Sequence, residues 1–212
     1  MKILPGFTGL LGATALALPL LAFAESNVQT GAATSSPGAT AHVDFTIVIP
    51  KILYLRVGAG SSYGTGVLAA NPAVDLITFS PTPAQLGNGT ALAGTGGDLT
   101  GGVETAAIVS NSGNVTLNAT ATGALTNATG DTISFAQITT AATTLTSATA
   151  LPAPVLTNST SANIVLTAPA TKVIVQDAKW TYSYANSAVV PTGTYGGVNT
   201  NNSRVVYTAT MP

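Results

Sequence analysis

The sequence predicts an all-β protein, specifically an antiparallel β-sandwich of about eight or nine strands. Charged residues make up only 6% of the 212 positions, against roughly 25% in typical domains. The helix-favouring residues Glu, Lys, Arg and Gln are scarce, whereas Thr and Val, which favour strands, are common. Short runs of alternating apolar and polar residues recur between turn-forming Gly, Pro and Asn, and no run has a helical period.

The strongest strand signal covers His42–Val57, and we expect it to organise the rest of the fold. Apolar residues occupy every odd position except Lys51, while the even positions begin polar with His42 and Asp44. Near Pro50 the even side becomes apolar as well, which is typical of a strand passing between two packed layers. Proline cannot donate a main-chain hydrogen bond, so Pro50 predicts a bulge or an edge. The odd row before Pro50 consists of Val43, Phe45, Ile47 and Ile49.

A second strong stretch covers Thr171–Tyr184. Val173 and Val175 lie on odd positions, but the apolar row that follows lies on even positions. This slip of phase at Gln176 predicts a bulge or a change of sheet. Trp180, the only tryptophan, is expected to anchor the core. The even row is Ala178, Trp180, Tyr182 and Tyr184.

The last predicted strand, Ser203–Met211, places Val205, Tyr207, Ala209 and Met211 on one face. Asn88–Gly102 is rich in glycine and is expected to be a long surface loop, and Thr139–Thr149 is expected to be an irregular connection or a weak edge strand. With the remaining runs, these strands favour a sandwich of Ig-like or pilin-like kind. The remaining strands are expected at Val74–Phe79, Glu104–Ser110, Val115–Thr122, Thr132–Ile138 and Ser161–Thr167.

Three segments are expected along the chain. Residues 1–24 have the charge, length and Ala22-Phe23-Ala24 exit of a secretory signal peptide. Residues 25–41 are small and polar and predict a flexible extension. Residues 42–212 are expected to form a single β-sandwich domain. The chain has no cysteine, so the exported fold depends on its core rather than on disulfides.

Near its end the chain has the element Gly193-Thr194-Tyr195 followed by the alternating strand Val205–Met211, and it begins with an export signal. In these features it resembles the pilin-type secreted subunits of the chaperone–usher class, including the spore-coat-U-like secreted proteins. The resemblance implies a non-enzymatic subunit of a fibre or surface layer. An assembly chaperone and an outer-membrane pore are the partners that such a subunit would use.

Two features depart from that pattern. Those families often carry a disulfide, and this chain has no cysteine. Their donor strand is an alternating apolar segment near the mature N-terminus, and residues 25–41 do not alternate in this way. Val43–Ile49 fits a donor strand better, but it could not then also be the first strand of its own subunit.

The sequence contains no catalytic, cofactor-binding or metal-binding constellation that we can recognise. His42 and Asp44 are best interpreted as a solvent-facing pair, because no nucleophile motif accompanies them. The acidic residues are scattered without calcium-binding spacing. The tyrosines and Trp180 could line a sugar platform, but in a sandwich they are more often core residues. Lys51 is expected to guard a strand edge against unwanted pairing.

Three classes of function therefore remain open. The first is a structural subunit of an extracellular fibre, pilus or matrix, assembled by adding strands at sheet edges. The second is a monomeric surface- or carbohydrate-binding adhesin module, and the third, disfavoured by the missing catalytic groups, is an enzyme. The near-neutral composition argues against nucleic acid as a partner. We expect the protein to be exported to the cell surface, the periplasm or the medium, and to contact itself through Val43–Ile49 or Ser203–Met211.

The export signal gives a first prediction. Cleavage after Ala24 should leave Glu25 as the first residue of the secreted protein. Intact-mass measurement of secreted material tests this, and a secreted chain that still carries residues 1–24 would contradict it.

Overall fold

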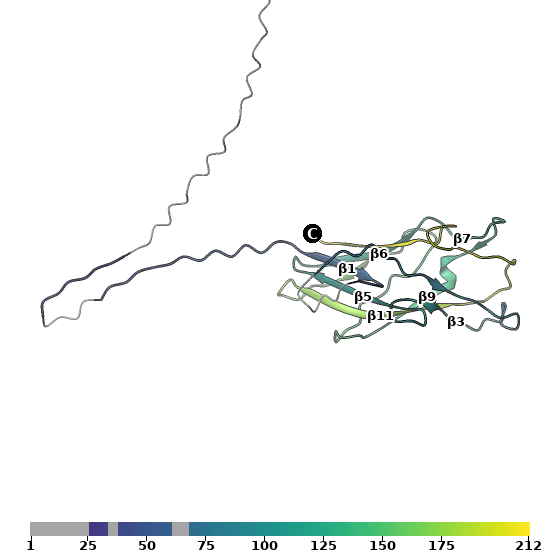
Figure 1. Cartoon of the computed structure of the whole chain (residues 1–212), viewed down its shortest axis with the longest axis horizontal. Helices are drawn as coiled ribbons and strands as arrows, with labels where there is room; N and C mark the ends of the chain where they lie inside the picture. The colour runs from purple at the N-terminus through teal and green to yellow at the C-terminus, as the bar shows by residue number, and fades with distance from the viewer. Residues whose placement is uncertain (1–25, 34–37, 61–67) are drawn as a thin grey trace, which may run out of the picture. The chain divides into compact units, whose positions relative to one another are not determined.

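The computed structural model describes residues 26–33, 38–60 and 68–212, and the expected signal peptide lies outside them. The chain divides into two units, Met1–Ile49 and Pro50–Pro212. In the first unit, the described residues are exposed and form no strand. All the described strands belong to the second unit, which is all-β and antiparallel (Figure 1).

The larger sheet is built on β11 (Ile174–Tyr184) and β5 (Val103–Ser110), its two longest strands. β1 (Leu53–Val57) pairs with β5 and ends the sheet on one side. β9 (Ile138–Thr143) pairs with β11 from Lys179 to Tyr184, and the short β3 (Leu92–Ala93) pairs with Ser183 and Tyr184 at the end of β11. All these pairings are antiparallel.

A second sheet has the order β10-β6-β12. Its strands are β10 (Ile164–Leu166), β6 (Val115–Ala121) and β12 (Val205–Thr210). The remaining described strands form two small two-stranded sheets. They pair β2 (Ile77–Thr78) with β4 (Thr95–Gly96), and β7 (Leu125–Thr126) with β8 (Thr132–Ile133).

The two larger sheets share one apolar core. β6 shows the period of two most clearly, because its odd-numbered residues are all buried while the Thr and Asn residues between them are partly exposed. From the other sheet, Ile108 and Trp180 enter the same core and are fully buried. Alternation along strands is therefore what sorts this low-charge sequence into a core face and an outer face.

The predicted strand over His42–Val57 was wrong in its first part. Only Leu53–Val57 forms a strand, and residues 42–52 are not in a sheet. Pro50 lacks the N–H that a ladder needs, and β5, the partner of β1, turns at Asn111. The apolar alternation before Pro50 thus has no partner strand among the residues that the structure describes.

The predicted slip of phase in the second stretch was also wrong. β11 runs against β5 in one unbroken register from Ile174 to Thr181. Val175 is half exposed rather than inward-facing, and Ile174 is buried in its place. Asp177 interrupts the apolar pattern because it is buried as a hydrogen-bond acceptor: its carboxylate accepts from the main-chain N–H of Thr146 and of Ser147, at 2.9 and 2.8 Å.

The predicted surface loop Asn88–Gly102 contains two short strands, β3 and β4. Its glycines with positive φ lie before β3 and from the end of β4 onward, and they are Gly89, Gly96, Gly97, Gly101 and Gly102. For the Ala- and Thr-rich stretch Thr139–Thr149, the edge-strand alternative is confirmed for its first part: the stretch begins with most of β9, which pairs with β11 alone among the described strands.

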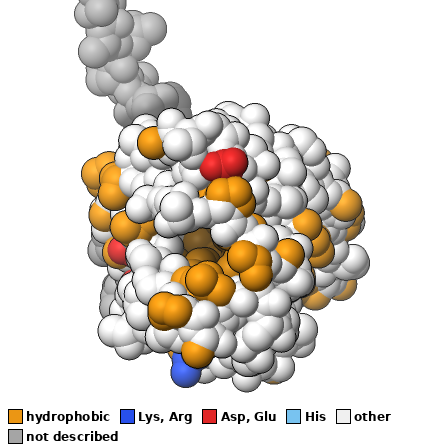
Figure 2. All heavy atoms as spheres, turned by 90° about the vertical axis from the view of Figure 1, so that its right-hand side faces the viewer, with side chains coloured by type: hydrophobic (Ala, Val, Ile, Leu, Met, Phe, Trp, Pro, Cys, Tyr) orange, Lys and Arg blue, Asp and Glu red, His pale blue; other side chains and the backbone are white. Residues whose placement is uncertain are grey.

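The surface is largely neutral. Figure 2 shows one end of the molecule, where apolar side chains lie around a hollow among uncharged polar groups and charged side chains are sparse. No helix in the described part of the chain is long and apolar enough to cross a membrane.

Trp180 gives the second prediction. Its side chain is fully buried, its Nε1–H donates to the Leu151 carbonyl at 2.8 Å, and its ring lies 5.2 Å from that of Tyr207. Trp180→Ala should lower the free energy of unfolding by about 3–5 kcal/mol in urea titrations. Val175→Ala, at an exposed site on the same strand, should cost far less. Equal losses in both variants would contradict this account of the core.

Candidate assembly interface

Val43–Ile49, which we call the apolar segment, exposes nearly all of its hydrophobic surface. Its five large apolar side chains are between 73% and 88% exposed. Four of them, Val43, Phe45, Ile47 and Ile49, alternate with Asp44, Thr46 and Val48. Contiguous exposed apolar residues commonly mark an interaction site, and this alternation is that of a strand with one face made for burial.

The second unit has a complementary feature where its two larger sheets end. β1 ends the order of one sheet and β12 that of the other, and the two strands lie side by side in Figure 1. Their core-facing rows pack against the core but are only partly buried, whereas the equivalent row on β6 is fully buried. We call these two rows the seam. They consist of Leu53, Leu55 and Val57 on β1, and of Val205, Tyr207, Ala209 and Met211 at β12.

Every second residue of β12 points its main-chain N–H and C=O groups away from β6, the one described strand with which β12 pairs. On β6, the Ala121 N–H donates to Ser159 and the Ala119 carbonyl accepts from Ser161, so the odd-numbered residues of β6 bond away from β12. In an antiparallel ladder, successive residues point their N–H and C=O groups to opposite sides. In this register the even-numbered residues of β12 lie opposite the even-numbered residues of β6, which bond toward β12. The even-numbered residues of β12 therefore form the hydrogen bonds to β6. Val205, Tyr207 and Ala209 point their N–H and C=O groups outward.

β1 has the same arrangement. The Gly58 N–H donates to Thr105 at 2.8 Å and the Ile52 carbonyl accepts from Asn111, so the even-numbered residues face β5. The odd-numbered residues of β1 turn their main-chain groups to the other side. A cavity of about 620 Å³ lies beside β1 and is lined by residues between Lys51 and Gly60 and by Leu68, Ala69, Ala70, Asn71 and Ala73. Both strands of the seam thus combine apolar side chains with outward-facing main-chain groups.

Polar contacts hold the seam in place. The Tyr207 hydroxyl lies 2.8 Å from the Tyr182 hydroxyl, which joins β12 to the centre of the larger sheet. Burial raises the pKa of Tyr207 to about 12 and raises that of Tyr182 as well, so both hydroxyls stay protonated and can hydrogen bond. The Lys51 ammonium donates to the Pro212 carbonyl at 2.8 Å, which brings the start of β1 to the end of β12.

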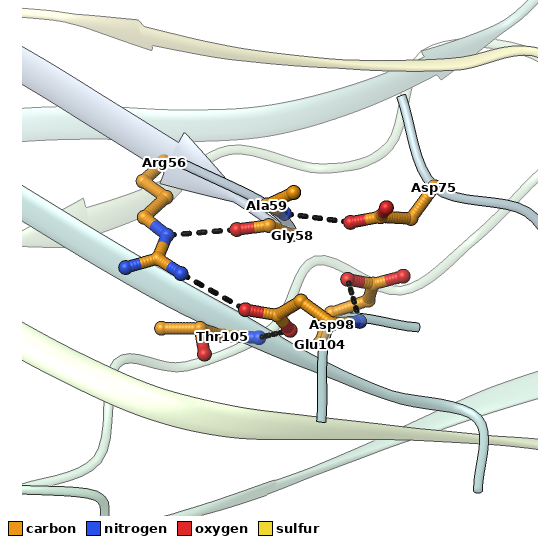
Figure 3. Close-up of polar contacts among 7 residues, drawn as sticks. All are labelled: Arg56, Gly58, Ala59, Asp75, Asp98, Glu104 and Thr105. Carbon is orange, nitrogen blue, oxygen red and sulfur yellow. Dashed lines mark hydrogen bonds and ion pairs between the residues drawn. The ribbon is translucent and has the colours of Figure 1, made fainter. Parts of the chain in front are cut away.

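The other end of β1 is fixed by a cluster of charged groups (Figure 3). Arg56 bonds the Gly58 carbonyl and pairs with the Asp98 carboxylate at 2.9 Å. The Asp98 carboxylate also accepts from the Thr105 N–H, and the main-chain N–H of Asp98 donates to the Glu104 carboxylate at 3.3 Å. Gly58 has a φ of +84°, and a side chain there would collide with Asp75 and lie 2.7 Å from Glu104, so only glycine fits.

Glu104 in this cluster has a strongly perturbed pKa. Its pKa is raised to about 8, chiefly by burial and also by the nearby Asp75 and Asp98 carboxylates, while the hydrogen bond from the Asp98 N–H opposes the rise. The side chain is only 4% exposed, and Glu104 lies opposite Trp180 in the sheet. We therefore regard this cluster as the anchor of the β1 end rather than as an open reaction site.

The other candidate residues lie partly in the first unit and partly in the core of the second. His42 and Asp44 are exposed, in the first unit. Trp180, Tyr182 and Tyr184 are buried in the core rather than arranged as a sugar platform. No group of three His, Cys, Asp or Glu residues in the described ranges is placed to hold a metal ion. Lys51, expected as an edge guard, lies just before β1 and reaches Pro212 instead of standing on a strand.

Sequence reasoning missed Asn111 and Glu104. Asn111 begins the turn-forming run Asn111-Ser112-Gly113-Asn114, which is a turn signal but does not show that the Asn111 side chain bonds Pro50 and Ile52. Glu104 was noted only as the start of a strand. Comparison of the chain with protein-family models, with curated proteins and with solved structures finds no match. Its function must therefore be inferred from its own geometry.

The pKa of Glu104 gives the third prediction. Because its pKa is higher in the folded state than the ordinary value of 4.5, its stabilising effect is complete below about pH 4.5 and declines as the pH rises to about 8. The decline can reach about 1.4 kcal/mol per pH unit. Glu104→Gln should flatten this slope in urea unfolding measured between pH 5 and 8, and should make the protein more stable than the wild type at pH 8. Asp44→Asn, which removes an exposed carboxylate, should leave the slope unchanged, and a slope unaffected by Glu104→Gln would contradict the assignment.

Proposed function

We propose that this protein is a non-enzymatic structural subunit of an extracellular fibre, pilus or matrix, with a pilin-like β-sandwich fold. Subunits join when the apolar segment of one copy adds as a strand to the seam of another. The observation that carries the proposal is the pairing of two incomplete features in one chain: an exposed alternating segment and a half-covered apolar edge.

The dimensions of the two features agree. Seven residues in a strand extend about 23 Å, and the six residues of β12 extend about 20 Å. The odd row of the apolar segment would face the seam, while Asp44 and Thr46 would face solvent. The strand would take the outward main-chain groups of Val205, Tyr207 and Ala209 as its ladder partners.

The gain in energy is large enough to hold subunits together. Burying one Val, Ile or Phe side chain contributes about 1.5–3 kcal/mol, so the four side chains of the odd row contribute roughly 6–12 kcal/mol before the costs of ordering the segment. The ladder adds a smaller net amount for each hydrogen bond. A surface with few charges offers little repulsion between copies.

Such assembly implies further partners. An assembly chaperone would cover the seam and the apolar segment of each exported subunit until it meets the next, because both are prone to unwanted edge pairing. An outer-membrane pore would release the assembled subunits. These partners, and export to the cell surface, belong to the proposal.

The adhesin alternative is less well supported. A cavity of about 300 Å³ lies beside β7 and is lined mainly by Asn, Thr and Gly. Ligand pockets are usually lined by hydrophobic and aromatic side chains, and among the described residues that line this cavity none is aromatic. The Asn127 amide there is already bonded to Thr129 and Asp131.

The fourth prediction tests the apolar segment. Ile47→Asp places a charge on the face that would be buried, whereas Thr46→Asp places the same charge one residue away on the other face. In sedimentation velocity over a range of concentrations, the wild type and Thr46→Asp should form larger species, and Ile47→Asp should remain monomeric. Monomeric wild type at every concentration, or the same behaviour in both variants, would contradict the proposal.

A further inference from the structure

The apolar segment is joined to the seam by three residues, Pro50, Lys51 and Ile52. Lys51 already touches the last residue of the chain, at the end of β12. A strand tethered this closely has an effective concentration in the millimolar range for its own seam. A subunit that could fold its own segment back would therefore complete itself before meeting a second copy.

The spacing alone does not prevent this. If the three residues formed a hairpin loop, Ile49 would lie opposite Leu53 and Ile47 opposite Leu55. Odd-numbered residues would then face odd-numbered ones, and the apolar row would lie on the core side of β1. Assembly between copies therefore requires something that prevents the loop from closing.

Asn111 holds the three residues straight. Its side-chain Oδ1 accepts from the Ile52 N–H and its Nδ2–H donates to the Pro50 carbonyl, each at 2.8 Å. Its main-chain N–H donates to the Ile52 carbonyl at 3.3 Å. All three bonds lie on the side of β5, so they extend the edge of β1 upstream to Pro50. A reversal at these residues would break them.

Ile52 opposes the reversal by its own chemistry. A three-residue hairpin loop usually consists of a type I turn followed by a residue in the left-handed region, most often glycine. Pro50 and Lys51 suit the first two positions, but Ile52 is β-branched and strongly disfavours the third. Ile52 is 38% exposed, so its side chain is not required there to fill the core.

We propose that Asn111 and Ile52 together form a gate that prevents a subunit from adding its apolar segment to its own seam, and so directs the segment to a second copy. This inference rests on the proposed function, because it concerns the same segment and seam. In this inference, Asn111 and Ile52 determine whether the chain forms a closed monomer or an assembly.

The test is the double variant Ile52→Gly/Asn111→Ala in the full chain. Glycine permits the left-handed position, and alanine removes the side-chain bonds. The double variant should lose the larger species in sedimentation velocity. Amides of Val43–Ile49 should exchange with solvent deuterium at least tenfold more slowly than in a dilute, unassembled wild type. Ile52→Val, which keeps the β-branched side chain and the bonds, should assemble as the wild type does.

A second variant covers the case in which the double variant fails to fold. Six Gly and Ser residues inserted between Ile49 and Pro50 leave the Asn111 bonds intact but let the segment turn back. This variant should also be monomeric with protected segment amides, and adding Ile47→Asp should remove the protection.

The outcomes separate this inference from the proposed function. If the wild type assembles through its segment, and the folded double variant and the insertion variant assemble equally well and show no protection of the segment amides while dilute and unassembled, the gate is wrong and strand addition stands. If the wild type does not assemble and its segment never becomes protected, the proposed function fails and the gate falls with it.

Discussion

The feature on which the rest of this structure depends is an apolar edge that the described chain does not cover. Where the two larger sheets end, β1 and β12 each present an inward row of apolar side chains that is only partly buried. The same two strands point main-chain N–H and C=O groups outward, as the bonding of their neighbours shows. An open edge of this kind normally invites pairing with another strand, and natural proteins usually block it.

The apolar segment is the counterpart of that edge. Val43–Ile49 carries an alternating row that its own unit does not bury. Both features are individually unfavourable in water, and the proposed strand addition would remove both at once. In this proposal the core around Trp180 stabilises each subunit, and a second copy supplies the missing cover.

Much of this could be predicted from the sequence. Composition and alternation predicted an all-β chain, and the alternation over Ser203–Met211 predicted which face of β12 turns inward. Alternation also found the apolar segment, because period two reveals a face made for burial. Alternation could not show that the apolar segment and β1 are separate, because their separation depends on where the partner strand β5 ends and on Pro50. The sequence pattern therefore predicted the two as one strand.

Other errors have the same origin, which is that local patterns omit long-range hydrogen bonds. The apolar pattern around Val175 suggested a slip because Asp177, a charged residue, is buried by bonds from Thr146 and Ser147, about thirty residues away. The role of Asn111 in holding Pro50 and Ile52 was equally invisible, because the turn signal identifies a turn but not the reach of its side chain.

The most direct measurement of the central claim mixes two variants that are each defective in one half of the contact. Ile47→Asp has an intact seam but no usable segment. Ala209→Pro has an intact segment, but it lacks an outward N–H on β12 and keeps the bonds to β6. Each variant alone should be monomeric in sedimentation velocity, and an equimolar mixture should form a one-to-one heterodimer and nothing larger. If the two variants do not associate, or if the mixture contains a series of oligomers larger than the heterodimer, strand addition at the seam is contradicted.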